Sequence, residues 1–257
     1  MNDLSGGRQT KISLKEPAAG TNASYSGDGW ANYWEGLDGT QSFFREQAKE
    51  YVANLECAVE LNRNVRVLDF GCGFGFVAKM LAPKVGKVFL WDTSVNMRRR
   101  ARLNLADHHN IGFVDLSEPQ AIARELNFDL IIVNSVVQYM SLEQFAACLV
   151  MWRTMLAAGG RIVVSDLIPH DYNSVADVVD LLKFSIRRNV LGSALLQVFR
   201  DLGSYWMTRH NFPLARIGLE ELRQRGNAAG LVVSWLPRNL TYFGGRLTAI
   251  FTQENPC

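Results

Sequence analysis

The stretch VRVLDFGCGFG, residues 65–75, constrains the fold of this chain more than any other part of the sequence. Its first six residues form the mainly apolar, partly β-branched run of a buried strand. Gly71, Gly73 and Gly75 then follow at every second position before FVAKMLA takes on a helical pattern. Glycine lets backbone amides approach a ligand without a Cβ in the way. The stretch therefore predicts a strand, a ligand-binding loop, and a helix whose N-terminus faces the ligand.

The spacing of these glycines disfavours two common ligands. A dinucleotide fingerprint that starts at Gly71 needs glycine at position 76, where the chain has Phe76. A phosphate-binding P-loop needs Lys-Ser or Lys-Thr after its last glycine, and neither follows. The remaining pattern, Asp-x-Gly-x-Gly-x-Gly, resembles the first motif of the class I S-adenosylmethionine-dependent methyltransferases. The resemblance implies that the methionine end of the cofactor is held by Asp69, Gly71, Cys72 and Gly73.

Two further acids follow at the spacing of this family. Asp92 ends the apolar run VFLW about twenty residues after the loop, where a carboxylate can accept both ribose hydroxyls of a nucleoside. A compatible alternative is that Asp92 caps the helix that starts near Ser94. The resemblance also implies cofactor contacts from Thr93, Met97, Asp115 and Leu116, with the last two at the adenine. An alternative for Asp115 is an acid that caps a turn.

A fourth motif, FDLIIVNSVVQYM, resembles the fourth-strand motif of small-molecule methyltransferases. It implies cofactor contacts from Asn134 and Ser135 and an acceptor contact from Gln138. Enzymes that methylate base amines or glutamine amides carry Pro-Pro-Tyr or a similar string after this Asn or Asp, so such acceptors are disfavoured here. Across about residues 25–252, the resemblance implies an α/β fold: a Rossmann-like, seven-stranded, mostly parallel sheet with helices on both faces and the last strand antiparallel.

The alternation of patterns along the chain agrees with one α/β domain. Phe44, Ala48, Tyr51, Leu55 and Val59 predict a long helix before the first strand. A turn is expected at 157–160, before a fifth strand, RIVVSDL. The expected divisions are a mobile tail (1–23), an N-terminal cap and helix (24–62), a cofactor-binding core (63–170), a helical lid insertion (171–213), and a last helix with strands six and seven (214–257).

Composition narrows the class of protein further. A net charge of +2 over 257 residues gives no general reason to expect nucleic acid, and the Arg98–Arg102 run is interpreted as a solvated helix face. The four cysteines show no CxxC pair or metal-ligand spacing with the histidines, so reduced thiols, no metal and a cytoplasmic location are expected. Neither a membrane span nor a signal peptide is expected from the sequence.

Aromatic residues before the first helix are expected to cap the cofactor and shape the acceptor entrance. Tyr33 and Trp34 are assigned to the cofactor, and Tyr25 and Trp30 to the acceptor. Packing on the sheet edge is an equally open alternative for all four.

The stretch 175–207 predicts two amphipathic helices broken near Gly192. Val178, Leu181, Leu182 and Ser185 would share one face of the first helix. The family roofs its acceptor pocket with insertions here, which implies acceptor contacts from Phe184, Phe199, Trp206 and His210. A basic edge of Lys183, Arg187 and Arg188 leaves open a peripheral contact with an anionic membrane surface.

Methyl transfer from a sulfonium is an in-line displacement, so positioning matters most. His170 is the candidate base if a proton must leave, with Asp171 to orient it and Tyr139 or His210 as substitutes. The expected function is methyl transfer from S-adenosylmethionine to a small apolar or lipid-like acceptor at oxygen, with nitrogen or carbon open. Two alternatives stand beside it: a cofactor-binding partner or regulatory subunit without transferase activity, and another enzyme of the same fold.

Overall fold

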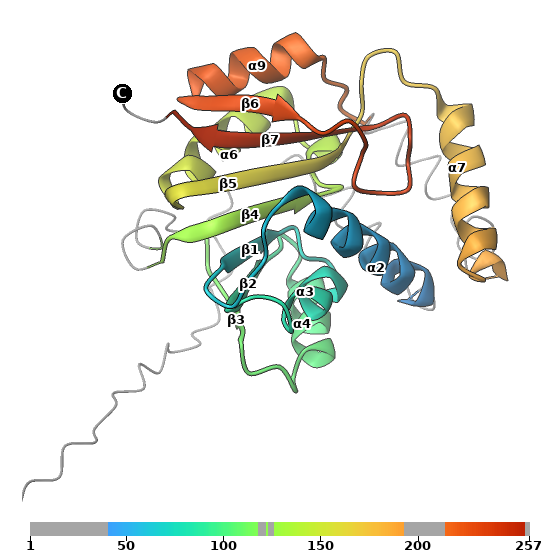
Figure 1. Ribbon diagram of the computed structural model, residues 1–257, viewed down its shortest axis with the longest axis horizontal. Helices are drawn as coiled ribbons and strands as arrows, with labels where there is room; N and C mark the ends of the chain where they lie inside the picture. The colour runs from blue at the N-terminus through green and yellow to red at the C-terminus, as the bar shows by residue number, and fades with distance from the viewer. Residues whose placement is uncertain (1–40, 118–121, 123–125, 193–213, 255–257) are drawn as a thin grey trace, which may run out of the picture.

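The structure is a computed structural model that describes residues 41–117, 122, 126–192 and 214–254. Its helices and strands follow in the order α2 (Gln41–Ala58), β1 (Arg66–Phe70), α3 (Phe76–Leu81), β2 (Lys87–Trp91), α4 (Val95–Asn104), β3 (Ile111–Phe113), β4 (Phe128–Asn134), η1 (Val137–Tyr139), α6 (Leu142–Thr154), β5 (Leu156–Leu167), α7 (Ser174–Arg187), α9 (Leu219–Ala228), β6 (Leu231–Trp235) and β7 (Leu247–Gln253). Strand and helix alternate along most of this order (Figure 1).

The strands form one seven-stranded sheet in the order β3-β2-β1-β4-β5-β7-β6. The pairs from β3 to β5 are parallel, and β7 pairs antiparallel with both β5 and β6. The predicted fold class is confirmed, including the antiparallel last strand. The strands after β1 first extend the sheet on one side, through β2 to β3, and then on its other side, from β4 onwards. The strand order therefore reverses between β1 and β4, which are parallel neighbours. Ligands of open α/β sheets bind at the carboxyl ends of the strands beside such a reversal.

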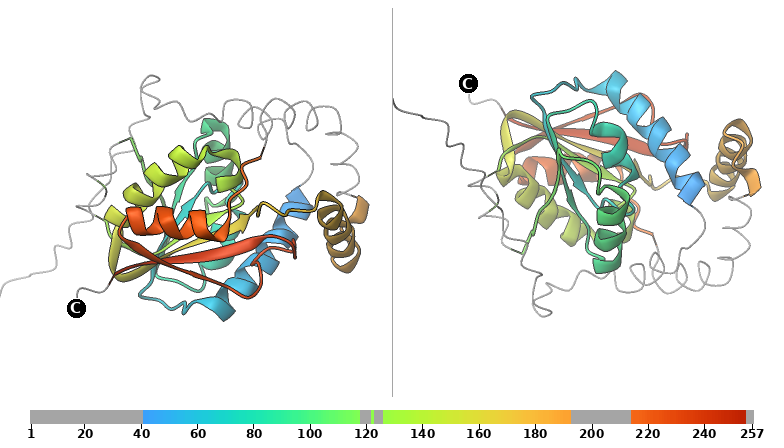
Figure 2. Two further views of the ribbon diagram at one scale, coloured as in Figure 1. Left: turned by 90° about the horizontal axis from the view of Figure 1, so that it is seen from above. Right: turned by 90° about the horizontal axis from the view of Figure 1, so that it is seen from below.

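Helices cover both faces of the sheet (Figure 2). On one face, the side chains of Phe70 and Val133 pack with Phe145 and Trp152 of α6. The other face packs against α2, α3 and α4, with Leu55 of α2 fully buried. Alternate residues of each central strand point to the two layers, which explains why these strands are apolar almost throughout.

The helix predicted before the first strand is present as α2, with Ala48, Tyr51 and Leu55 buried as the spacing indicated. The turn predicted at 157–160 is wrong, because β5 already begins at Leu156. Leu156 pairs with Phe128, and the register shifts before Leu130 pairs with Arg161. Gly159, at φ 74°, lies within this irregularity of β5, which accommodates the small residues inside the strand.

The insertion after β5 agrees with the prediction in part. Helix α7 ends at Arg187, and Asn189 takes φ 55°, so the break lies before Gly192. Ser185 of the predicted face is buried, but Val178 and Leu182 are exposed. Figure 2 shows α7 standing apart from the sheet, near the N-terminal end of α2. The predicted second helix, the N-terminal tail and the aromatic cap lie outside the described residues.

In the part of the chain that the structure describes, no helix combines the length and the apolar character that crossing a membrane requires.

Candidate functional site

The glycine loop connects β1 to α3, and its three glycines have different physical roles. Gly71, Gly73 and Gly75 all take positive φ, at 79°, 51° and 77°. A Cβ on Gly71 would lie 2.3 Å from the Val136 side chain, and one on Gly75 would lie 2.7 Å from Leu105. A Cβ on Gly73 would meet no atom of the described chain within 4 Å. Gly71 and Gly75 are therefore needed for packing, whereas Gly73 borders open space in which a ligand can lie against the backbone.

Asp92, at the end of β2, is bonded to this loop. Its Oδ2 accepts a hydrogen bond from the Gly73 backbone N–H at 2.9 Å, and its Oδ1 accepts one from the Ser94 N–H at 2.9 Å. The cap of α4 is Ser94, whose hydroxyl accepts from the Met97 N–H. The alternative in which Asp92 itself caps this helix is therefore wrong.

Asp69, at the end of β1, is a buried carboxylate with one unpartnered oxygen. The residue is 3% exposed, and no donor in the described chain reaches its Oδ2. Burial, with a further contribution from the nearby Asp92 charge, raises the pKa of Asp69 to about 7 against a weaker opposing effect of the Ala78 backbone. A buried acceptor of this kind is costly unless a donor or cation binds beside it.

Other predicted cofactor residues near the loop are held by the protein. Burial and the charges of Asp92 and Asp69 raise the pKa of the Cys72 thiol, which keeps it neutral. The Met97 side chain is buried in a cluster with Phe74 and Phe76. The Thr93 backbone carbonyl accepts a hydrogen bond from Arg98. Any contact of Met97 or Thr93 with a ligand must therefore leave these interactions in place.

The acid after β3 forms a turn. Asp115 is exposed, and its Oδ1 accepts from the Ser117 N–H at 3.0 Å. The turn alternative is thus observed, and it leaves the other carboxylate oxygen free to accept from a ligand. Leu116 packs its side chain into the core, so its backbone is the part of the residue that can contact a ligand.

The segment after β4 begins with a second orphaned acceptor. The Oδ1 atom of Asn134 is buried and has no partner in the described ranges. The next two predicted contacts are engaged elsewhere: the Ser135 hydroxyl donates to Asp166, and the Gln138 Oε1 atom accepts from Arg246, each at 2.8 Å. Tyr139 lies half-buried at the end of η1. Of these four side chains, Asn134 is the one with an unsatisfied buried atom.

His170 lies in the loop between β5 and α7 and bonds a residue that the sequence did not indicate. Its Nε2 atom is 2.7 Å from Oε2 of Glu221, which also accepts from the Gly218 N–H at 2.8 Å. The Gly218 amide and then His170 lower the pKa of Glu221, so the carboxylate is ionised. Glu221, rather than Asp171, therefore orients the imidazole. A carboxylate can only accept, so Nε2 carries the hydrogen and Nδ1 is left as the basic atom.

The predicted acceptor contacts are described only in part. Phe184 is buried, with its ring stacked on Tyr242 at 4.5 Å and edge-on to Phe43 at 5.6 Å, so it joins α7 to α2 and the 239–246 loop. The other contacts expected from aromatic residues and from the last candidate base lie outside the described residues: Tyr25, Trp30, Tyr33, Trp34, Phe199, Trp206 and His210.

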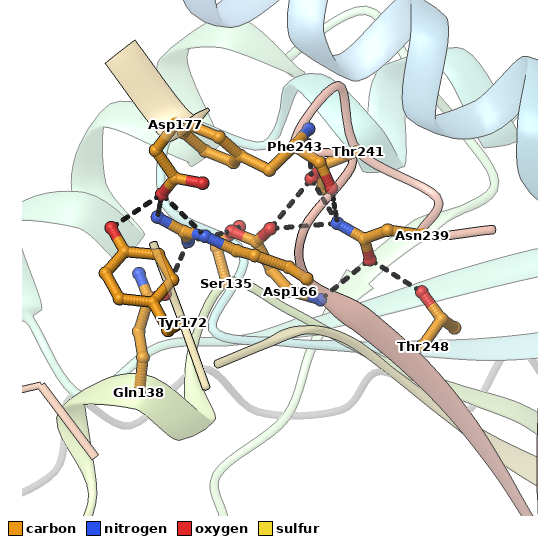
Figure 3. A network of polar contacts seen from close by, with 10 residues as sticks. Ser135, Gln138, Asp166, Tyr172, Asp177, Asn239, Thr241, Phe243 and Thr248 are labelled. Atoms are coloured by element: carbon orange, nitrogen blue, oxygen red, sulfur yellow. Dashed lines mark hydrogen bonds and ion pairs between the residues drawn. The ribbon is translucent and has the colours of Figure 1, made fainter. Parts of the chain in front are cut away.

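Sequence reasoning missed a buried polar network centred on Arg246, whose partners are labelled in Figure 3. Its guanidinium bonds Asp166, Asp177 and Gln138. Further members of the network are Ser135, Tyr172, Asn239, Thr241 and Thr248. Asp166 and Asp177 both bind the same guanidinium. No group of three or more potential metal ligands is found among the residues described.

A family model described as "Methyltransferase domain" matches residues 68–162, which run from β1 into β5. One curated relative is a probable cobalt-precorrin-6B C(15)-methyltransferase (decarboxylating) from Methanothermobacter thermautotrophicus. It is 23% identical over 175 residues, which cover 67% of this chain and 88% of the relative.

Solved structures share the fold at low sequence identity. Magnesium protoporphyrin IX methyltransferase from Synechocystis PCC 6803, with bound S-adenosylhomocysteine, is 17% identical with a TM-score of 0.53, covering 89% of this chain and 94% of that one. A chain in complex with the Haloferax volcanii Trm112 methyltransferase activator is 14% identical with a TM-score of 0.56, covering 90% and 97%.

The sheet order, the glycine loop and the matched model make residues 68–162 a methyltransferase domain. This domain match and the seven-stranded sheet are those of class I S-adenosylmethionine-dependent methyltransferases, enzymes whose cofactor is S-adenosylmethionine.

The observed site fits this cofactor. S-adenosylmethionine carries an ammonium group and a sulfonium, and the two orphaned acceptors, Asp69 Oδ2 and Asn134 Oδ1, lack donors in the described chain. They lie at the carboxyl ends of the neighbouring strands β1 and β4, which pair in parallel. Open space next to Gly73 completes the cradle. These are the features that a cationic ligand with a nucleoside would satisfy.

Proposed function

We propose that this protein transfers a methyl group from S-adenosylmethionine to a small, apolar or lipid-like acceptor, at an oxygen atom. The observation that carries the cofactor half of the proposal is the pair of unsatisfied buried acceptors beside the open face of Gly73. The acceptor half is supported by an exposed apolar surface on α7. That surface consists of Val175, Val178, Val179, Leu182 and Ile186, each between 41% and 68% exposed.

Each proposed cofactor contact follows from the geometry of its residue. The Asp69 carboxylate and the Asn134 amide oxygen accept from the ammonium group. Each carboxylate oxygen of Asp92 already accepts one hydrogen bond from a backbone amide, and its remaining lone pairs accept from the ribose hydroxyls. Asp115 and the Leu116 amide contact the adenine. These acceptors hold the cofactor in one orientation, which is the main requirement of an in-line displacement.

The bound cofactor supplies an electrophilic methyl group on a sulfonium. For a hydroxyl acceptor the chain must also remove a proton, and His170 is the proposed base. Glu221 holds the imidazole so that Nδ1 can accept that proton, and it stabilises the imidazolium that results. Tyr139 is the alternative group, since it lies on the segment that follows Asn134.

The proposed size and character of the acceptor rest on two points. The exposed stripe on α7 offers an apolar surface next to a basic edge that includes Lys183. The relatives named above act, by their names, on precorrin and on magnesium protoporphyrin IX, both small molecules compared with a protein or nucleic acid. Contact of α7 with a membrane surface is part of the same proposal, because a lipid-like acceptor would be drawn from one.

Turnover to S-adenosylhomocysteine tests the proposal. The protein would be incubated with S-adenosylmethionine and panels of apolar alcohols, phenols and amines, and product would be detected by mass spectrometry. We expect S-adenosylhomocysteine to form with hydroxyl compounds, and His170→Gln to lower that rate more than the affinity for S-adenosylmethionine. Tight cofactor binding without turnover on any panel would instead favour the binding protein without transferase activity. Turnover that consumes the cofactor without methylating the acceptor would favour another enzyme of this fold.

A further inference from the structure

Arg246, the residue before β7, uses its whole guanidinium inside the protein. Nη1 donates to Asp166 and to Gln138 at 2.8 Å each, while Nε and Nη2 donate to Asp177 at 3.0 and 2.5 Å. The residue is 7% exposed, and its guanidinium lies 3.9 Å from the centre of the Phe243 ring. One planar group therefore fixes three side chains at once, which a lysine could not do.

These three partners come from three different elements of the fold. Gln138 belongs to the segment after β4 that begins at Asn134, and Asp166 lies near the end of β5. Asp177 lies in the first turn of α7, where it also accepts from the Tyr172 hydroxyl. Neither side-chain bond of Asp177 reaches the 134–139 segment directly. Arg246 bonds a residue of each, Gln138 and Asp177.

The network also holds two backbone positions in an unfavourable conformation. Ser135 and Asp166 take φ 58° and 70° although neither is glycine, and the Ser135 hydroxyl donates to Asp166 Oδ2 at 2.8 Å. Asn239 and Thr241 bond the other oxygen of Asp166 at 3.1 and 2.7 Å. Strained backbone of this kind persists where surrounding contacts determine it, and it is frequent beside functional sites.

Burying these charges is not an efficient way to stabilise the fold. Two carboxylates face one guanidinium, and apolar side chains of the same volume would commonly be as stable or more so. What the arrangement provides is a fixed geometry at the carboxyl edge of β4 and β5, one residue from the orphaned amide of Asn134.

We propose that Arg246 is a positioning residue that couples the cofactor-facing segment 134–139 to α7, so that the two are ordered together. The inference rests on the proposed function only in taking that segment to contact the cofactor. Ser135 and Gln138 then serve as the attachment points of the segment, and Asp177 as that of the helix.

Amide hydrogen exchange of the full-length protein tests the coupling without any ligand. Asp177→Asn and Arg246→Lys should both raise exchange in 134–139 as well as in 174–187, by about tenfold for a coupling of usual strength. The matched control is Arg187→Gln, which removes a bond of α7 to Glu50 outside the network and should raise exchange in α7 only. If Asp177→Asn raises exchange in α7 alone, or if Arg246→Lys behaves as the unaltered protein does, the proposal is wrong.

A second readout separates positioning from mere stability. S-adenosylhomocysteine should protect residues 71–97 and, through Arg246, also 174–187 in the unaltered protein. In Arg246→Lys the protection of 71–97 should persist while that of 174–187 is lost. If S-adenosylhomocysteine slows amide exchange in residues 71–97 of the unaltered protein but not in 174–187, the coupling is contradicted. Absence of protection at 71–97 contradicts the proposed cofactor contacts instead, and the ligand-free exchange data then still decide the role of Arg246.

Discussion

The Oδ2 atom of Asp92 accepts a hydrogen bond from the backbone N–H of Gly73 at 2.9 Å, and this bond joins the end of β2 to the open part of the glycine loop. The same carboxylate thus shapes the loop and faces the place where the ribose is proposed to bind. Its two functions can be separated by measuring folding and affinity on the same variant.

Replacing Asp92 by Ala should weaken binding of S-adenosylhomocysteine by about 1.5 to 3 kcal/mol, or roughly 10- to 150-fold, because a charged partner of two hydroxyls is lost. Calorimetric titration measures this directly. Asp129→Ala is the matched control, since Asp129 is a partly exposed acid near the amino end of β4, two strands from β2, where it bonds Arg66. Equal losses in the two variants would show that Asp92 has no specific contact with the ligand.

Asp69→Asn should stabilise the protein without ligand while weakening its affinity for S-adenosylmethionine. The pKa of Asp69 in the folded state is about 7, above its unfolded value, so between about pH 4 and 7 the folded state binds more protons than the unfolded state. This carboxyl group therefore removes stability as pH rises through that range, and the cost remains at higher pH. An amide carries no charge to desolvate. Thermal unfolding at about pH 8 should show a higher midpoint for Asp69→Asn. A lower midpoint would mean that the carboxylate is better satisfied than its surroundings indicate.

The affinity for S-adenosylmethionine should rise with pH around neutrality. Ionisation of Asp69 creates the anion that the ammonium group of the cofactor needs, and this ionisation is centred at about pH 7. Dissociation constants measured between about pH 6 and 8 should decrease severalfold in the unaltered protein, and the Asp69→Asn profile should be flat by comparison. A flat profile in both would remove Asp69 from the binding site.

Two glycine substitutions in the same loop should affect different properties: Gly75→Ala mainly the stability of the fold, and Gly73→Ala mainly the affinity for the cofactor. Gly75→Ala brings a Cβ to 2.7 Å from Leu105 and should lower the free energy of unfolding by about 1 to 3 kcal/mol. The Cβ of Gly73→Ala meets no atom of the described chain within 4 Å, so its cost to folding should be smaller, whereas its methyl group enters the ligand space. Urea unfolding and calorimetry on both variants check this. If Gly73→Ala binds the cofactor as tightly as the unaltered protein, the ligand does not approach this face of the loop.

The sequence was sufficient wherever the signal is local. Three glycines after an apolar strand, followed by an acid about twenty residues on, predicted the loop and an acid at the end of the next strand, and parallel neighbouring strands bring their carboxyl ends together. The apolar periodicity of α2 likewise matched its buried face. In each case the residues that form the feature lie within one or two adjacent elements.

Features made by distant segments were not predictable in this way. Arg246 precedes an apolar strand with no local pattern, and its partners lie 69 to 108 residues away in sequence. Glu221 bonds His170 across 51 residues, which is why the adjacent Asp171 had been assigned to that position. On α7 the periodicity identified an apolar stripe, but periodicity cannot tell which face a helix turns to the protein. Here Phe184 and Ser185 are buried, and much of the stripe is exposed.

Calorimetric titration of the purified protein with S-adenosylhomocysteine at about pH 8, where Asp69 is ionised, tests the central claim most directly. We expect saturable binding at one site per chain, with an affinity that the Asp69→Asn variant loses in large part. Absence of binding, or binding that Asp69→Asn leaves unchanged, would contradict the assignment of the glycine loop as the cofactor site.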